Sequence, residues 1–302
     1  MVAVCNPKGG VAKTTSAFHL GCAWAAMGRR VLWVDLDPQA ALTAWALGPQ
    51  AGQRDARDAG GPGGAHPPGR AGEAGRATVA AGLMGRAEAG KLVLATPHGP
   101  DLLPSGLELA VAEMELVAHP APERRLLRLL APLRDRYDYV LVDCQPSLGL
   151  LVQNALAAAD GVVVPVACEY LAVRALGLLM RALRRVRLEV NSQLAVLAVV
   201  PTLYDRRTLH ARQALEEVRR SFGERTWVAD WPVVKSVRFA EAARQGVPVW
   251  TLSPLHPGGE AYRAVAAGLE GRRVQPPIRW DQADEEEDGS AGMQAPWRPV
   301  PA

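Results

Sequence analysis

Short apolar runs alternate with longer amphipathic stretches along most of the chain. The short runs are continuous and rich in β-branched residues, which is typical of strands buried on both faces of a sheet. They are residues 2–5, 30–35, 139–142, 161–166 and 194–200. Helical periodicity follows the first run as far as Gly28 and returns at 107–118, 123–136, 148–159, 171–187 and 209–222. Strands alternating with helices form right-handed βαβ units, so we predict an α/β fold: a doubly wound, mostly parallel sheet with helices on both faces.

Two segments do not follow this pattern. Residues 50–76 contain eight of the 29 glycines and almost no large apolar residue, a composition that cannot bury enough surface to order itself. The last segment, 271–302, combines prolines with six acids against a single base between 281 and 302. We therefore expect one domain over 1–270, with a flexible insertion at about 50–76, and a disordered acidic, proline-rich tail over 271–302.

Composition narrows the class of protein. The 302 residues are 49% hydrophobic and 22% charged, with a net charge of +3 that the acidic tail lowers, so the body is basic. No stretch approaches the roughly 18 uncharged apolar residues of a membrane span, and the N-terminus does not resemble a secretory signal. We expect a cytoplasmic protein that does not bind a membrane. The cysteines lack metal-site spacing and are expected to be buried thiols: Cys5, Cys22, Cys144 and Cys168.

The most specific chemical signal lies between the first predicted strand and the first predicted helix. It reads Lys8-Gly9-Gly10-Val11-Ala12-Lys13-Thr14-Thr15. Glycines allow successive backbone N–H groups to surround an oxyanion at the positive end of a helix. Lys13 can reach the β and γ phosphates of a nucleotide, and the Thr14 hydroxyl can coordinate Mg²⁺. A glycine-rich turn without a ligand is the alternative, which the spacing of two lysines, two glycines and two threonines disfavours.

Two aspartates are expected to complete this site. Asp37 follows the second predicted strand and Asp143 follows the strand at 139–142, so both belong to the carboxyl edge of the sheet, where the loop lies. An aspartate at such a position holds Mg²⁺ and offsets the charge that develops in phosphoryl transfer. Taken alone, each could be a turn residue or a helix cap. Asp35 also ends the second strand and ranks behind Asp37.

Together these segments resemble the ParA/Soj family of deviant Walker ATPases, within the larger MinD/ParA group. The ordinary Walker loop does not fit, because Pro7 and Ala12 stand at its glycine positions, whereas the deviant form KGGxxK[ST] does. The resemblance covers residues 2–270 apart from the insertion. Its motifs occur in the family's order: KGGVAKTT, VLWVDLDPQ, DYVLVDCQPSLGLLVQNAL, VPTLYDRRT and VRFAEA.

The resemblance implies an ATPase with ATP or ADP and Mg²⁺ as cofactors, weak intrinsic hydrolysis, and stimulation by DNA and a partner. It implies a homodimer formed face to face around two nucleotides, in which Lys8 reaches the partner's phosphates. Lys8, Lys13 and Asp37 would be catalytic. The metal would be held by Thr14, Asp37 and Asp143. The nucleotide would be bound by the whole loop, Lys8, Gly9, Gly10, Val11, Ala12, Lys13, Thr14 and Thr15, together with Asp143 and Pro201. Asp37 would also orient the attacking water. The base would lie near Pro201–Asp205 and Pro232–Ser236.

Arginines crowd the second half of the chain, and for each of them a solvated helical surface is the simplest interpretation. As a set they could neutralise phosphates and give sequence-independent binding to double-stranded DNA. In the family such arginines act in the ATP dimer, and the matching residues here are Arg207 and Arg238. The resemblance thus implies a nucleoid-associated ATPase that segregates plasmids or chromosomes with a ParB-type centromere-binding protein.

Other members of the larger group remain alternatives. A ParA-like ATPase could position another cargo, such as chemosensory or cellulose-synthesis machinery, which the sequence does not distinguish. A MinD-type membrane ATPase is disfavoured because the tail is acidic and interrupted by prolines. A tyrosine autokinase is disfavoured because the tail has no tyrosine, and an iron–sulfur carrier because paired cysteines are missing. The sequence also departs from the common family residues at Pro7, Ala12, Ala40 and Gln145.

Overall fold

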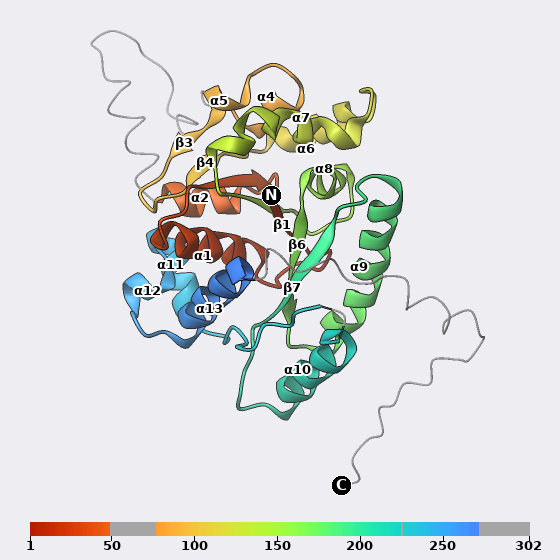
Figure 1. The fold of residues 1–302 in the computed structure, drawn as a ribbon. Coiled ribbons are helices and arrows are strands. Elements are labelled where there is room, and N and C mark those ends of the chain that lie inside the picture. Colours follow the sequence, from red (N-terminus) through yellow and green to blue (C-terminus); the bar gives the residue numbers. More distant parts are fainter. Residues whose placement is uncertain (49–76, 225, 272–302) are drawn as a thin grey trace, which may run out of the picture.

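A seven-stranded sheet forms the centre of the part that the computed structural model describes, which is residues 1–48, 77–224 and 226–271 (Figure 1). The strand order is β3-β4-β2-β5-β1-β6-β7. All neighbours are parallel except β3 and β4, which are antiparallel. The strands are β1 (Val2–Val4), β2 (Val31–Leu36), β3 (Leu94–Ala95), β4 (Asp101–Leu103), β5 (Tyr139–Cys144), β6 (Gly161–Ala167) and β7 (Ala195–Thr202). The predicted doubly wound, mostly parallel sheet is confirmed.

Helices cover both faces of this sheet. They are α1 (Lys13–Ala26), α2 (Ala41–Leu47), α4 (Val79–Leu83), α5 (Ala89–Leu92), α6 (Glu108–Leu116), α7 (Arg125–Leu130), α8 (Leu150–Ala158), α9 (Tyr170–Glu189), α10 (Leu209–Phe222), α11 (Arg238–Gln245), α12 (Val249–Leu252) and α13 (Pro257–Gly271). The stretch predicted to be helical over 123–136 is helical, but it is not one continuous α-helix. Two 3₁₀ segments, Pro122–Arg124 and Ala131–Arg136, flank α7 instead, because Pro132 has no N–H to continue an α-helix and its ring clashes with the preceding turn.

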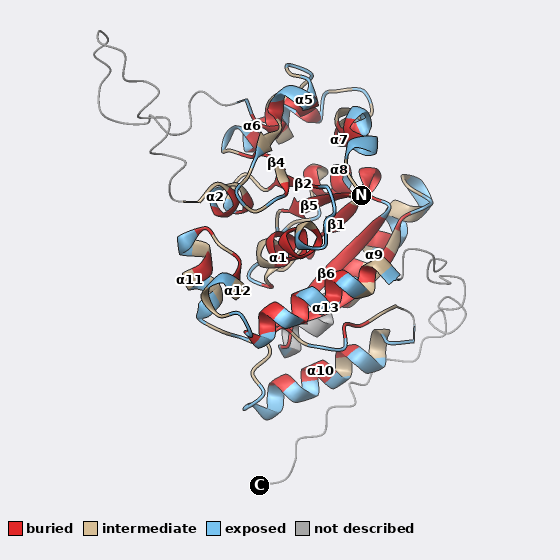
Figure 2. Cartoon of the chain, turned by 60° about the vertical axis from the view of Figure 1, so that its left-hand side comes forward, coloured by how far each residue is buried: buried red, intermediate tan, exposed pale blue. Residues whose placement is uncertain are grey.

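The two faces of the sheet carry separate hydrophobic cores. Alternation along β2 sends Leu32, Val34 and Leu36 into the core under α4 to α9, whereas Val31 and Trp33 enter the core under α1, α2 and α11 to α13. Figure 2 shows the strands buried between exposed outer helix faces. Strands covered on both sides explain why their sequence is continuously apolar.

Helix α1 is held very close to β2. A Cβ on Gly21 would lie 2.0 Å from the Trp33 indole nitrogen, so a larger residue has no room there. The Trp33 Nε1–H donates to the Ala17 carbonyl at 3.0 Å, and the Trp24 Nε1–H donates to the Ala266 carbonyl of α13 at 3.1 Å. These contacts fix the helix that carries the predicted phosphate loop at its N-terminus.

Two predicted segments lie outside the described residues: the insertion at 50–76 and the tail beyond Gly271. The short strands β3 and β4 and the helices α11 to α13 were not predicted. Among the described helices, none combines the length and apolar character that crossing a bilayer requires.

Candidate functional site

The predicted phosphate loop connects the carboxyl end of β1 to the first residue of α1, Lys13. The backbone turns at Gly10, with a φ of +72°, and at Ala12, with φ 69° and ψ 35°. Both residues therefore lie in the left-handed region, which directs successive N–H groups to one side. The first N–H groups of α1 add the positive end of the helix to the same place. The loop N–H groups and the N-terminus of α1 can therefore bind an anion together.

Strands β6 and β7 anchor the loop from beneath. The Asn6 Nδ2–H donates to the Pro165 carbonyl at 2.8 Å, while the Asn6 Oδ1 accepts the Lys8 N–H at 2.9 Å. The buried Thr202 hydroxyl donates to the Val11 carbonyl at 3.0 Å, and the Val11 side chain packs in the core. Val11 was predicted to bind the cofactor. Because its side chain is buried in the core, only its backbone could make such a contact.

Lys13 lies folded over the loop. Its Nζ donates to the Lys8 carbonyl at 2.9 Å, and its side chain is largely buried. Burial lowers the pKa of Lys13, and the nearby Asp143 carboxyl acts in the opposite direction. The ammonium group is thus held beside the loop, where a phosphate would provide charge-assisted hydrogen bonds.

Asp143 ends β5 as a completely buried carboxyl group. Within the described residues neither of its oxygens makes a hydrogen bond of regular geometry, although the Thr14 side chain lies close enough to act on the carboxyl and buried polar groups are nearly always paired. Burial is the main reason that the pKa of Asp143 is raised well above its usual value, and Asp35 on the neighbouring strand raises it further. A cation bound to this carboxyl group would compensate the cost of burying it.

These groups fit Mg²⁺ bound together with a nucleotide. No set of three His, Cys, Asp or Glu side chains gathers into a metal site among the residues that the structure describes. The predicted ligand set differs from such a cluster, since it combines the Thr14 hydroxyl with Asp37 and Asp143. Mg²⁺ usually takes one or two carboxylates and completes its shell with water and phosphate oxygens. The buried Asp143 carboxyl is the observation that supports this fit.

Asp35 and Asp37 differ in their surroundings. The buried Asp35 carboxyl accepts hydrogen bonds from the Thr43 N–H at 2.8 Å, the Thr43 hydroxyl at 2.7 Å and the Asp37 N–H at 3.2 Å. Burial raises the pKa of Asp35 to about 6. Asp37 is half-buried and its Oδ1 accepts the Gln39 N–H at 2.9 Å. Asp35 therefore shapes the loop that presents Asp37 at the carboxyl edge of the sheet.

Lys8 forms an ion pair that the sequence analysis missed. Its Nζ lies 2.8 Å from the Glu169 Oε2, and both side chains are partly exposed. Glu169 immediately precedes α9, and its pKa is lowered chiefly by the hydrogen bond from Lys8. The sequence contained a signal for this ion pair, because an acidic residue shortly after the strand at 161–166 lies at the same edge of the parallel sheet as the phosphate loop.

The two segments predicted near the base lie side by side. The Val233 N–H donates to the Pro201 carbonyl at 2.8 Å, the Tyr204 N–H donates to the Val233 carbonyl at 3.0 Å, and the Lys235 N–H donates to the Tyr204 carbonyl at 2.9 Å. Leu203, which precedes Tyr204, has a φ of +52°, which is unusual for a bulky side chain. The structure thus brings together the two stretches on which the predicted base contacts depend.

The predicted DNA-binding arginines extend from the same pair of segments. Arg207 forms an ion pair with Asp205 at 2.8 Å, and Arg238 forms one with Glu241 at 2.8 Å. Their side chains are 84% and 55% exposed, respectively, so these ion pairs contribute little and can exchange with phosphate. The bridge between Tyr204 and Val234 ties their loops together.

The alanines that depart from the family pattern have a cost in stability. Ala12 and Ala40 both have positive φ, 69° and 51°, a conformation that glycine adopts without strain. We expect Ala12→Gly and Ala40→Gly each to raise the free energy of unfolding by about 1 kcal/mol in denaturant titrations. The control is Ala264→Gly on an exposed position of α13, which should lower it by about 1 kcal/mol. A loss of stability in all three variants would show that the backbone at Ala12 and Ala40 is not strained.

Comparison with known proteins identifies relatives over most of the chain. A family model described as "AAA domain" matches residues 1–196. The sporulation initiation inhibitor protein Soj of Bacillus subtilis is 36% identical over 267 residues, which cover 88% of this chain and 96% of Soj. The chromosome partitioning protein ParA of Caulobacter vibrioides is 37% identical over 269 residues, covering 88% and 92%.

A solved structure is similar throughout the fold. It is the cobyrinic acid a,c-diamide synthase from Mycobacterium smegmatis with bound ADP and magnesium, which is 34% identical with a TM-score of 0.71. The match covers 92% of this chain and 98% of that one. The same protein has also been solved with an ATP analogue and magnesium.

Proposed function

The chain belongs to the ParA/Soj family of partitioning ATPases, and from this premise we propose that it hydrolyses ATP as a dimer that binds DNA and segregates a replicon with a ParB-type partner. The observation that carries the proposal is the loop at the end of β1, where the buried Lys13 lies near the buried Asp143 carboxyl. An anion and a divalent cation would together satisfy this arrangement.

In the proposed site, MgATP is bound by the loop from Lys8 to Thr15. Lys13 and the backbone N–H groups at the start of α1 bind the β and γ phosphates. Thr14, Asp37 and Asp143 hold Mg²⁺, which when bound offsets the charge on the phosphates. The likeness to a protein solved with ADP and magnesium supports this assignment.

Hydrolysis requires groups that reach the γ phosphate from two sides. Asp37 orients the attacking water, since it lies half-buried at the carboxyl edge beside the loop. Lys8 leaves Glu169 and reaches the nucleotide of the partner, where its charge stabilises the transferring phosphoryl group as an arginine finger does. Hydrolysis is therefore slow in a monomer and depends on assembly.

DNA binding depends on the same assembly. A monomer offers few phosphate contacts, whereas a dimer presents two copies of Arg207 and Arg238 on one surface. Affinity for DNA rises steeply with the number of phosphates neutralised, so the ATP dimer binds the nucleoid and the monomer releases it. The partner acts by stimulating hydrolysis.

Charge reversal tests the arginines. We expect Arg207→Glu and Arg238→Glu each to lower the affinity of the ATP-bound protein for duplex DNA by about 10-fold or more, equally for unrelated sequences. ATP affinity should remain unchanged. The matched control is Arg134→Glu, which changes the net charge equally but pairs with Asp160 beside the N-terminus. DNA titrations at several salt concentrations measure the effect. Equal losses in all three variants would show that net charge, and not this surface, controls binding.

A further inference from the structure

His19 of α1 is completely buried, and both of its ring nitrogens are bonded. Burial lowers the pKa of His19 to about 3, so the ring is neutral. The Val249 N–H, at the start of α12, donates to Nε2 at 3.0 Å. The ring proton is therefore on Nδ1, which donates to the Thr15 carbonyl at 2.8 Å. His19 thus joins the first turn of α1 to α12.

Four aromatic side chains from other helices surround this imidazole. Tyr262 of α13 stacks on it, with the ring centroids 5.1 Å apart. The others meet it edge to face at 5.2 to 5.3 Å: Trp45 of α2, Phe239 of α11 and Trp250 of α12. Aromatic pairs in these geometries stabilise beyond the area that they bury. We call His19 and these four side chains the His19 cluster.

A chain of hydrogen bonds leads from the phosphate loop to His19. The Lys13 N–H, which the proposed site directs at phosphate, belongs to the same peptide unit as the Ala12 carbonyl. That carbonyl accepts the Ser16 N–H at 2.9 Å, and the peptide unit of this N–H carries the Thr15 carbonyl to which His19 donates. Hydrogen bonds in such a chain polarise and strengthen one another. An anion at the Lys13 N–H would therefore strengthen the bonds that His19 makes.

Tyr262 is bonded to the same turn of α1. The Ser16 hydroxyl donates to the Ala12 carbonyl at 2.7 Å, so the Tyr262 hydroxyl, 3.0 Å away, donates to the Ser16 oxygen. The side chains of Ser16 and Tyr262 are completely buried. Two members of the His19 cluster, His19 and Tyr262, are therefore bonded to the turn that begins at the phosphate loop.

Phe239 extends the cluster to its neighbour in the chain, the candidate DNA-binding residue Arg238. Its ring meets His256 edge to face at 5.3 Å as well as His19 at 5.2 Å. The His256 Nε2 lies 3.0 Å from the Ser236 hydroxyl oxygen, which accepts the Arg238 N–H at 3.2 Å. A shift of the start of α11 would therefore disturb contacts to both histidines.

We propose that His19 is a positioning residue for DNA binding, which fixes the place of Arg238 when the phosphate loop is occupied. The inference rests on the proposed function, in which MgATP binds the loop and Arg238 contacts duplex DNA. Stronger bonds at His19 hold the cluster, and Phe239 with it, so that less freedom of Arg238 is lost when DNA binds. The nucleotide thus acts on the arginine within one chain, in addition to bringing two copies together.

Two substitutions at position 19 test this connection in the full chain. Asparagine carries an N–H at the place of the imidazole Nδ1 but is too short to reach Val249, whereas glutamine can accept the Val249 N–H. With a slowly hydrolysed ATP analogue and Mg²⁺, His19→Asn should bind duplex DNA about 10-fold more weakly than the wild type, a typical size for coupling between two sites. His19→Gln should recover most of the affinity. ATP affinity and dimerisation, measured by calorimetry and light scattering, should stay near wild type in both.

Trp24→Phe is the control for stability. It removes the buried Nε1–H that donates to the Ala266 carbonyl at 3.1 Å, so it also breaks a hydrogen bond between α1 and a later segment of the chain. Thermal melting should show a loss of stability comparable to that of His19→Asn, while the affinity for DNA stays unchanged. Equal losses of DNA affinity in Trp24→Phe and His19→Asn would show that stability, and not the connection through His19, controls binding.

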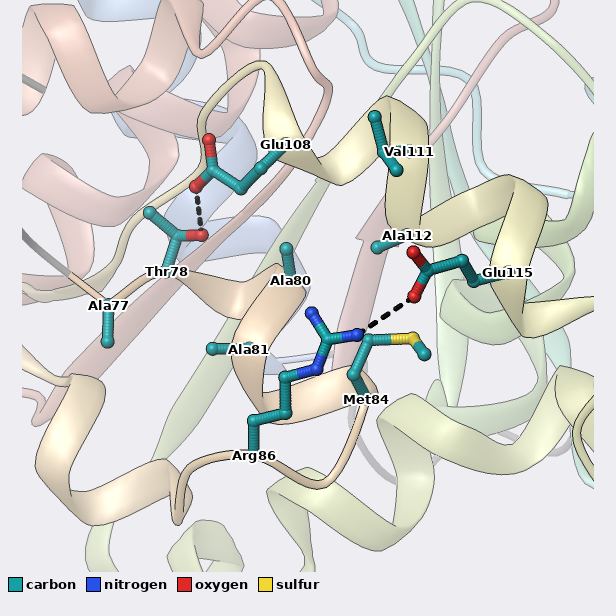
Figure 3. Close-up of a pocket in the computed structure, with 10 residues that line it drawn as sticks. All are labelled: Ala77, Thr78, Ala80, Ala81, Met84, Arg86, Glu108, Val111, Ala112 and Glu115. Atoms are coloured by element: carbon teal, nitrogen blue, oxygen red, sulfur yellow. Dashed lines mark hydrogen bonds and ion pairs between the residues drawn. The ribbon is translucent and has the colours of Figure 1, made fainter. Parts of the chain in front are cut away.

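A double-mutant cycle tests whether His19 acts through Arg238. If it does, His19→Asn should have little effect on DNA affinity in a chain that already carries Arg238→Gln, and its full effect of about 10-fold beside Arg86→Gln. Arg86 is the matched control, a surface arginine that pairs with Glu115 at 3.0 Å at the hollow between α4 and α6 (Figure 3). Equal effects of His19→Asn in the two backgrounds would overturn the inference.

Phe239→Leu tests the other end of the connection, and does so even if His19→Asn does not fold. Leucine keeps an apolar side chain but loses the edge-to-face contacts with both histidines, so DNA affinity with the analogue should fall by about 5-fold. Unchanged affinity in Phe239→Leu would overturn the inference and leave the proposed function standing. If the wild type binds DNA no better with the analogue than with ADP, the proposed function and the role of His19 both fail.

Discussion

Replacing Lys13 with alanine is expected to lower the affinity for MgATP by about 100-fold or more. The Nζ of this lysine is held over the phosphate loop by the Lys8 carbonyl at 2.9 Å, and burial lowers its pKa because no counter-charge compensates it fully. Phosphate oxygens would supply that charge through hydrogen bonds of about 1.5–3 kcal/mol each. Loss of one or two such bonds corresponds to the expected change.

Isothermal titration calorimetry with MgATP measures this loss. The control is Lys91→Ala, in which an equally charged side chain of α5 that is 76% exposed pairs with Glu88, the residue before that helix. Circular dichroism should show that both variants are folded. Undiminished ATP affinity in Lys13→Ala would show that the nucleotide does not bind at this loop.

Lys8→Ala is expected to separate binding from turnover. The variant should bind ATP as a monomer with near wild-type affinity, fail to form the ATP dimer, and hydrolyse ATP about 10³-fold more slowly, the scale on which a charge supplied in trans acts. The structure supports this separation because Lys8 projects to Glu169 and not over its own loop. Light scattering and steady-state hydrolysis give the two readings.

Glu169→Gln is the companion to that variant. It removes the ion pair at 2.8 Å while keeping the size of the side chain, so Lys8 no longer has to leave a carboxylate. An exposed pair contributes at most about 1 kcal/mol and a dimer would release two of them, so dimerisation should tighten by no more than about 30-fold. A normal ATP dimer in Lys8→Ala would reduce Lys8 to a surface residue and leave Glu169 without a role.

The sequence predicted the parts of the molecule that local pattern determines. Strands β1, β2 and β5 to β7 are apolar on both faces, which makes them recognisable, and the phosphate loop is a contiguous segment. Glu169 and Thr202 were missed because each contacts the loop from more than 160 residues away. Strands β3 and β4 have two and three residues, too few for any alternation to appear.

The candidate site was predicted less completely than the fold. Asp35 and Asp143 look alike in sequence, since each ends an apolar strand. The structure distinguishes them, because Thr43 and the Asp37 N–H occupy the Asp35 oxygens, while within the described residues the Asp143 oxygens make no hydrogen bond of regular geometry. That difference depends on how the loop after β2 folds back, which no local pattern specifies.

Titration of the wild-type chain with duplex DNA of unrelated sequences tests the central claim, that ATP controls DNA binding through assembly. With a slowly hydrolysed ATP analogue and Mg²⁺, affinity should rise by about 100-fold over the ADP-bound protein, and the slope of log affinity against log salt should roughly double as two copies contribute contacts. Affinity and salt slope that are the same with the analogue, with ADP and without nucleotide would contradict it.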